Sequence, residues 1–383
     1  MAATDITGQL AGFMMQARDT GLPPEIAQAG KHRILDTLAA MVSGARLVPG
    51  EMATKYARRL GGVPESSVLA TDVRTSAVNA ALANGMFGHA DETDDFEPFT
   101  KAHPGCSVVP AALAMAEREG SSGEELLRAV VLGYDVCCRF LIALGPDLVR
   151  GGHRSAEGTS STMGAAASAA SIAKLDEAGM RYVLSYAAQQ VSGLWSWVRD
   201  SEHVGKAFDF SGMSARNGVT AAAMVYEGFT GVWDILEGEH NVLDALSPSP
   251  SPEEMIKDLG SHFWVTETAI KPYPVGYPIQ AALGAFFALH REHGLTVDNV
   301  ASVTVNLPED GARIVNGRSM PDVNCQHMVA LALIDGSVTF ESTHAYERMS
   351  DPELLAVKER VSLVPSAALM GRDAPAAPRW RWS

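Results

Sequence analysis

Residues His89-Ala-Asp-Glu-Thr-Asp-Asp-Phe-Glu-Pro-Phe-Thr-Lys-Ala-His-Pro-Gly105 form a charged segment between two stretches of apolar, small-residue sequence. The segment crowds together the carboxylates of Asp91, Glu92, Asp94 and Asp95. Because neighbouring carboxylates repel one another when all are ionised, at least one pKa should be displaced. An acidic run is more often a solvated loop. Here helix-like sequence lies on both sides, so we interpret the segment as the lining of a cleft.

Outward from this segment, residues 1 to about 245 show helical patterns almost throughout. Pro23-Pro24-Glu25 opens a helical segment that ends at Gly44, and Ser122-Gly-Glu-Glu125 is a capping box for a helix over 126–144. The run Gly164-Ala-Ala-Ala-Ser-Ala-Ala-Ser-Ile-Ala173 is so rich in small residues that its helix should pack closely against others.

The pattern changes near residue 265. Ala301-Ser-Val-Thr-Val-Asn-Leu307 alternates with the period of a strand, and helical sequence flanks it at 279–293 and 328–333. We therefore expect a mainly α protein, with a large all-helical domain over 1–265 and a smaller α+β lid domain over 266–361. Residues 362–383 lack periodicity and are expected to be an irregular, altered or truncated tail.

Composition excludes several classes of function. Lys and Arg number 30 against 45 Asp and Glu, and the net charge of −15 disfavours nucleic acid and anionic membrane as partners. The four cysteines form no CxxC pair, which indicates a reducing, cytoplasmic setting and no thiolate-bound cluster. No signal peptide or membrane span is evident. Walker A, GxGxxG, HExxH and GxSxG motifs are absent, so nucleotide, nicotinamide and serine-hydrolase functions lack their required parts.

Other residues of potential chemical importance stand alone in the sequence. His153 precedes the small-residue helix, Lys206 and Arg216 lie in a glycine-punctuated segment, and Lys271-Pro-Tyr273-Pro is a rigid turn. A single histidine is more often a cap or core residue, and a single lysine is usually at the surface. A divalent metal on the acidic run lacks a partner motif with ligand spacing, so we predict no metal.

Taken in order, these pieces resemble the MmgE/PrpD superfamily of 2-methylcitrate dehydratases and cis-aconitate decarboxylases, over about residues 5–361. The matching motifs are Asn84-Gly85, His89-Ala-Asp-Glu-Thr-Asp-Asp95, His103-Pro-Gly, Gly133-Tyr-Asp135, Gly152-His153, Lys206, Ala215-Arg-Asn-Gly218, Gly228-Phe-Thr-Gly231, Lys271-Pro-Tyr-Pro274 and Ala330-Leu-Ala-Leu-Ile-Asp-Gly336. The resemblance implies a helical domain, a smaller α+β lid, a cofactor-free active site between them and a homodimer.

Carried over residue by residue, the family's site falls on Asp91 or Glu92, His103, His153, Lys206 and position 280. Three departures stand out. Position 280 is Gln280 where the family has a histidine, and Phe96 and His327 stand where a threonine and a tyrosine are expected. These departures argue against cis-aconitate and 2-methylcitrate as the substrate.

We therefore hypothesise a cofactor-independent lyase, of the dehydratase type, that acts on a small di- or tricarboxylate or hydroxy acid through an enolate-like intermediate. His103 and His153 are the candidate acid/base pair, and Asp91 or Glu92 orients a histidine or takes the proton. Lys206 is the remaining catalytic candidate, and the candidate substrate-binding residues are Arg216, Lys271, Tyr273, Gln280 and His327. The alternatives are a dicarboxylate epimerase or isomerase, or an impaired member of the family that only binds its ligand.

Overall fold

The computed structural model describes residues 5–370 and divides into two compact units. The large unit comprises the chain up to Ala90 together with Asp94–Ile270, and the small unit comprises Asp91–Thr93 and the chain from Lys271. Within the described residues, no helix is both long and apolar enough to cross a membrane. All four cysteines are buried and free of disulfide bonds.

The large unit is helical apart from a two-stranded antiparallel ribbon of β1 (Ser66–Ser67) and β2 (Arg74–Thr75). Its α-helices are α1 Ile6–Asp19, α2 Pro24–Gly44, α3 Val48–Leu60, α4 Ala77–Gly88, α5 Gly105–Glu119, α6 Gly123–Leu144, α7 Pro146–Gly151, α8 Ala156–Ile172, α9 Glu177–Gln190, α10 Val204–Ala207, α11 Met213–Tyr226 and α12 Val242–Leu246. A π-helical turn, Phe208–Gly212, joins α10 to α11. The predicted capping box at Ser122 and Glu125 is confirmed at the start of α6.

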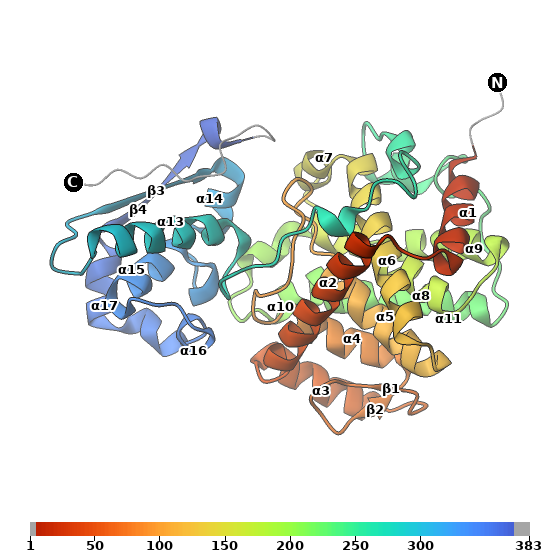
Figure 1. Cartoon of the computed structure of the whole chain (residues 1–383), viewed down its shortest axis with the longest axis horizontal. Helices are drawn as coiled ribbons and strands as arrows, with labels where there is room; N and C mark the ends of the chain where they lie inside the picture. The colour runs from red at the N-terminus through yellow and green to blue at the C-terminus, as the bar shows by residue number, and fades with distance from the viewer. Residues whose placement is uncertain (1–4, 371–383) are drawn as a thin grey trace. The chain divides into compact units, whose positions relative to one another are not determined.

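The small-residue helix α8 is fully buried and packs against α5, α6 and α11, as Figure 1 shows. Glycines let these backbones approach. A Cβ added at Gly164 would lie 2.5 Å from the carbonyl oxygen of Gly133 on α6. A Cβ added at Gly218 on α11 would lie 2.5 Å from the backbone nitrogen of Ala166 on α8. Any larger side chain at either crossing would have to push helix backbones apart.

The small unit is built around two parallel strands, β3 Val303–Pro308 and β4 Val361–Ser366, paired from Val303 with Val361 to Pro308 with Ser366. Its helices are α13 Tyr277–His293, α14 Glu309–Val315, α15 Cys325–Asp335, α16 Phe340–Thr343 and α17 Pro352–Lys358. Buried and half-buried residues alternate along β3, as its sequence predicts. A mainly α fold with a smaller α+β part is therefore confirmed.

The chain after residue 361 differs from our expectation of an irregular tail. Residues Val361–Ser366 form β4, because Val361 is buried and the strand pairs along the whole of β3. Local alternation is weak here, so the strand is defined by its partner rather than by its own sequence. The remainder of the expected tail, residues 371–383, lies outside the described residues.

Candidate functional site

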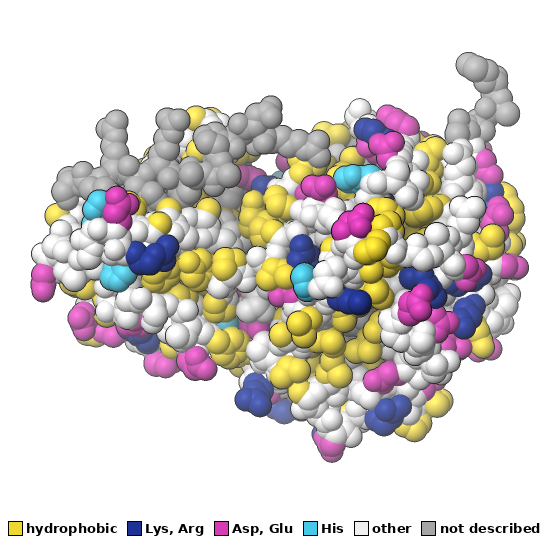
Figure 2. Space-filling view, viewed as in Figure 1, with side chains coloured by type: hydrophobic (Ala, Val, Ile, Leu, Met, Phe, Trp, Pro, Cys, Tyr) yellow, Lys and Arg dark blue, Asp and Glu magenta, His cyan; other side chains and the backbone are white. Residues whose placement is uncertain are grey.

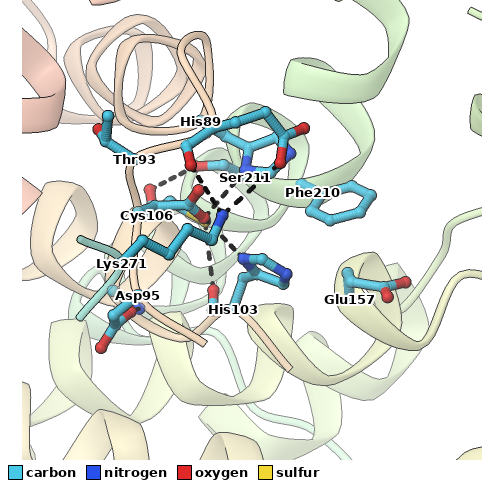
Figure 3. A network of polar contacts seen from close by, with 12 residues as sticks. His89, Thr93, Asp95, His103, Cys106, Glu157, Phe210, Ser211 and Lys271 are labelled. Atoms are coloured by element: carbon cyan, nitrogen blue, oxygen red, sulfur yellow. Dashed lines mark hydrogen bonds and ion pairs between the residues drawn. The ribbon is translucent and has the colours of Figure 1, made fainter. Parts of the chain in front are cut away.

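The loop between α4 and α5 places one carboxylate between two histidines in the large unit. Asp94 Oδ2 lies 2.9 Å from the Nδ1 of His89 and 2.9 Å from the Nδ1 of His103. Figure 3 shows both histidines near Phe210. His89 and Asp94 have no exposed surface, and His103 retains 7%. His103 is therefore the histidine of this pair that a ligand can approach.

The shared oxygen determines the tautomer of both rings. A carboxylate oxygen only accepts hydrogen bonds, so the Nδ1 of each histidine must carry the proton. When His103 is neutral, its lone pair is then on Nε2, the nitrogen remote from Asp94. Asp94 thus prepares His103 to accept a proton at Nε2.

Aromatic side chains form the apolar side of this cluster. The ring of Phe210, on the π-helical turn, stacks on His89 at 4.1 Å and 15° and meets His103 edge-on at 5.2 Å. The ring of His203 lies 5.3 Å from that of His89. Burial lowers the pKa of His89 well below its usual value, and the positive charge of Lys206 adds to this against the opposing carboxylate of Asp94. His89 is therefore neutral near pH 7.

Lys206 brings a buried positive charge to the same cluster. Its side chain is on α10 and is buried, with Nζ 5.0 Å from the ring centre of Phe210 and 5.4 Å from that of Trp197. Such cation–π contacts stabilise an ammonium group out of water. Lys206 and His103, two of the predicted catalytic residues, thus contact the same ring.

Asp95 has a structural role beside the cluster. Its Oδ1 accepts a hydrogen bond from the backbone N–H of Gly105 at 3.0 Å, and its Oδ2 accepts one from the Tyr134 hydroxyl at 2.8 Å. Arg33 Nε lies 3.6 Å from Oδ2. Burial nevertheless raises the pKa of Asp95. A Cβ added at Gly105 would lie 2.5 Å from Asp95 Oδ1, so glycine is needed where α5 begins.

Two other predicted residues of the large unit lie elsewhere. His153 is exposed, on a turn where its φ is +62°. Arg216 directs its guanidinium to Asn217 Oδ1, at 3.0 and 3.1 Å, and over the ring of Phe208. Conversely, no pattern in the sequence favoured Asp94 over Asp91 and Glu92, or pointed to His203. The only signal was the position of His89 and His103 at the two ends of the acidic segment.

In the small unit, the carboxylates of Asp91 and Glu92 serve local contacts. Asp91 Oδ1 accepts hydrogen bonds from the backbone N–H of Thr93 at 3.1 Å and from its hydroxyl at 2.6 Å. Glu92 has a φ of +58°. Lys271 donates to the Glu92 carbonyl oxygen at 3.0 Å and lies 3.6 Å from its Oε2, with both side chains buried. Glu92, a predicted catalytic residue, and Lys271, a predicted substrate-binding residue, therefore form a buried ion pair.

Gln280 braces the Lys-Pro-Tyr-Pro turn from helix α13. Its Oε1 accepts from the N–H of Tyr273 at 3.2 Å, and its Nε2 donates to the carbonyl oxygens of Tyr273 and Val275 at 2.8 and 2.7 Å. The ring of Tyr273 stacks on Phe287. His327, at the start of α15, is fully buried, and burial lowers its pKa to about 4.

His89, Asp94 and His103 could also hold a metal, since their three ligand atoms lie within 4.8 Å of one another. The separations of 2.9 Å are those of N–H···O hydrogen bonds. Ligands bound at about 2.1 Å to one tetrahedral ion lie roughly 3.4 Å apart, which would require Asp94 to withdraw.

The Asp94 carboxylate already accepts hydrogen bonds from the Nδ1 atoms of His89 and His103 and needs no metal to balance it. We accordingly expect dialysis against a strong chelator to leave turnover unchanged. Activity before and after dialysis, with metal content measured by mass spectrometry, checks this. Loss of activity that one divalent ion restores would assign His89, Asp94 and His103 as ligands instead.

Two family models match the chain. The MmgE/PrpD N-terminal domain matches residues 8–255 and the MmgE/PrpD C-terminal domain matches residues 273–380. A cis-aconitate decarboxylase-like protein, oryM, of Aspergillus oryzae is 24% identical over 91% of this chain and 77% of its own. A cis-aconitate decarboxylase of Aspergillus terreus is 25% identical over 76% of this chain. The match spans 61% of that decarboxylase's own length.

Proposed function

Because this chain belongs to the MmgE/PrpD family, we propose that it is a cofactor-independent lyase of the dehydratase or decarboxylase type. Its substrate is a small di- or tricarboxylate or hydroxy acid. The observation that carries the proposal is the Asp94 oxygen shared by the Nδ1 atoms of His89 and His103, with the Lys206 ammonium packed on the same aromatic ring.

In this proposal His103 Nε2 is the acid/base atom. In a dehydration it takes the proton from the carbon next to a carboxylate, and the hydroxyl on the adjacent carbon leaves with a proton as water. In a decarboxylation the bond to a carboxylate carbon breaks and CO2 leaves. His103, which must then start in its protonated form, donates a proton to the remaining carbanion and regains one from solvent. Lys206 stabilises the negative charge that develops in either case. His153, Arg216 and Lys271 remain candidates for proton transfer and carboxylate binding.

Proton NMR in D2O with a panel of di- and tricarboxylates, cis-aconitate included, tests the proposal. Net loss of water or CO2 from one substrate supports a lyase. Solvent deuterium incorporation with loss of stereochemistry, but without elimination, would replace it by an epimerase. Saturable binding of a carboxylate without turnover or deuterium exchange would show that the protein only binds its ligand.

We also propose that the protein is a homodimer. Large apolar side chains are exposed along α2 and α3, namely Leu35, Val42, Met52, Tyr56 and Leu60. Figure 2 shows hydrophobic side chains gathered over these helices on the viewed face. Exposed apolar side chains that gather on one face are typical of a protein–protein interface, and closed two-fold dimers are the commonest assembly.

Light scattering at micromolar concentration is expected to give the mass of a dimer. Met52→Glu combined with Tyr56→Glu should shift the mass towards the monomer, because charge is costly to bury at an interface. Phe229→Glu is the matched control, since Phe229 is 50% exposed and Tyr56 51%. A wild-type monomer, or a dimer that only Phe229→Glu disrupts, contradicts this assignment.

A further inference from the structure

Asp209 is a buried carboxyl group that the proposed acid/base chemistry does not use. It lies on the π-helical turn Phe208–Gly212, next to Phe210, which contacts the histidine pair. A π-helical turn inserts an extra residue into a helix and is often found at functional sites. Asp209 lies between α10, which carries Lys206, and α11, and it is 9% exposed.

The carboxyl group of Asp209 occupies a space formed by two glycines. A Cβ added at Gly193 would lie 3.2 Å from Asp209 Oδ1, and one added at Gly158 would lie 3.3 Å from Oδ2. Gly193 also has a φ of +132°, which other residues rarely adopt. Asp209 Oδ1 accepts a hydrogen bond from the backbone N–H of Leu194 at 3.1 Å. Among the described residues, Oδ2 has no hydrogen-bond partner.

Leu194 is one side of a short antiparallel pairing, and the other side carries His153. Arg154 pairs with Leu194, the N–H of Trp195 donates to the His153 carbonyl oxygen at 3.0 Å, and the N–H of Ser155 donates to the Gly193 carbonyl oxygen at 3.2 Å. His153 needs such support, because its φ of +62° is unfavourable for a non-glycine residue.

We propose that Asp209 is a positioning residue for His153, acting through Leu194 and the segments 153–155 and 193–195. The role assigned to His153 rests on the proposed function, but the pairing that Asp209 supports does not. The π-helical turn Phe208–Gly212 then places Phe210 against the His89–Asp94–His103 cluster. The same turn places Asp209 against the paired segments, one of which carries His153.

The protonation of Asp209 makes this support depend on pH. Burial raises the pKa of Asp209 to about 7, and the negative charge of Glu157 adds to the shift, against hydrogen bonds from Ser155 and Leu194. The charged groups of the adjoining elements are Glu157 on α8, Arg150 of α7, Arg154, Lys206 on α10 and Arg216 on α11. Arg150 lies 3.3 Å from Glu157.

The sign of the effect follows from proton linkage. If local opening returns Asp209 to its ordinary pKa near 3.8, only the closed form holds the proton between about pH 4 and 7. Protection of the paired segments is then greatest at low pH and falls by up to about tenfold per pH unit until it levels off above about pH 7.

Hydrogen–deuterium exchange of peptides covering 153–158 and 192–196, measured from pH 5 to 8 and corrected for intrinsic exchange, tests this in the intact protein. We expect the protection of these peptides to fall with rising pH in the wild type. In Asp209→Asn we expect the protection not to vary with pH. In Glu157→Gln the levelling-off should occur at a lower pH, because a charge that raises the pKa of Asp209 is removed. Asp176→Asn, which changes an exposed helix cap, should leave the wild-type response unaltered.

A wild-type protection that does not vary with pH overturns the proposal, whether or not the chain proves to be a lyase. So does a pH response that survives in Asp209→Asn. If Asp209→Asn does not fold, the wild-type series and Glu157→Gln still decide the matter. Once a substrate is known, Asp209→Asn should also alter the pH profile of kcat while leaving KM near the wild-type value, and an unchanged profile counts against positioning.

Discussion

His103→Ala is expected to lower kcat by at least about a hundredfold, the usual scale for a positioned acid or base. His103 combines a tautomer fixed by Asp94 with residual exposure, whereas His89 is sealed from solvent. Asp94→Asn should also lower kcat, because the amide removes the negative charge that holds the N–H of both rings. Steady-state kinetics on the substrate identified by NMR measure both effects.

His32→Ala provides the control, since His32 is an exposed histidine on α2 of the same unit. Melting temperature and circular dichroism establish that each variant is folded. A folded His103→Ala protein with near wild-type turnover would reduce His103 to a structural residue. Near wild-type turnover in a folded Asp94→Asn protein would show that catalysis depends neither on the histidine tautomers nor on the negative charge of Asp94.

Lys206→Met is the second change expected to have a large effect, of at least about a hundredfold on turnover. Methionine keeps much of the length of the side chain against Trp197 and Phe210, so packing is largely retained while the positive charge is lost. The charge matters because a fixed cation in a buried site stabilises developing enolate charge without reorganisation. Lys206→Arg should restore only part of the activity, since a planar guanidinium differs in shape.

Lys257→Met is the matched control, because Lys257 is a solvent-exposed lysine that pairs with nearby Glu254. Removing the Lys206 charge should also raise the pKa of His89, since that charge contributes to lowering it. Histidine NMR of the folded variant measures this without substrate. Turnover within a fewfold of wild type in Lys206→Met would contradict a role in charge stabilisation.

The sequence predicted the regular elements of this protein well, because their signals are local. The capping box of α6, the start of α2 and the alternation of β3 each depend on a few adjacent residues. The strand β4 was missed, since it is specified by pairing with β3 across a long stretch of chain. Long-range pairing leaves little trace in a single segment.

The sequence pointed to the segment 89–105 as a candidate, but it did not predict which of its carboxylates contacts the histidines. Sequence spacing on an irregular loop does not reveal which carboxylates face which side chains. The left-handed backbone at Glu92 turns the chain, so that Asp94 meets both histidines while Glu92 pairs with Lys271. His203 itself has a left-handed backbone conformation, as the residue just before α10, and its ring lies next to that of His89. Such conformations are rare for these residues and follow from tertiary packing.

The assignment of Asp91–Thr93 to the small unit has a consequence for biosynthesis. The contact between Lys271 and Glu92 joins residues that are 179 positions apart, so this unit cannot complete its structure from a contiguous piece of chain. At about 5–20 residues per second, a ribosome needs on the order of ten seconds or more to reach Lys271 after Glu92 has emerged. The large unit can begin to form in that interval, and truncations that start at residue 271 should yield an incomplete small unit.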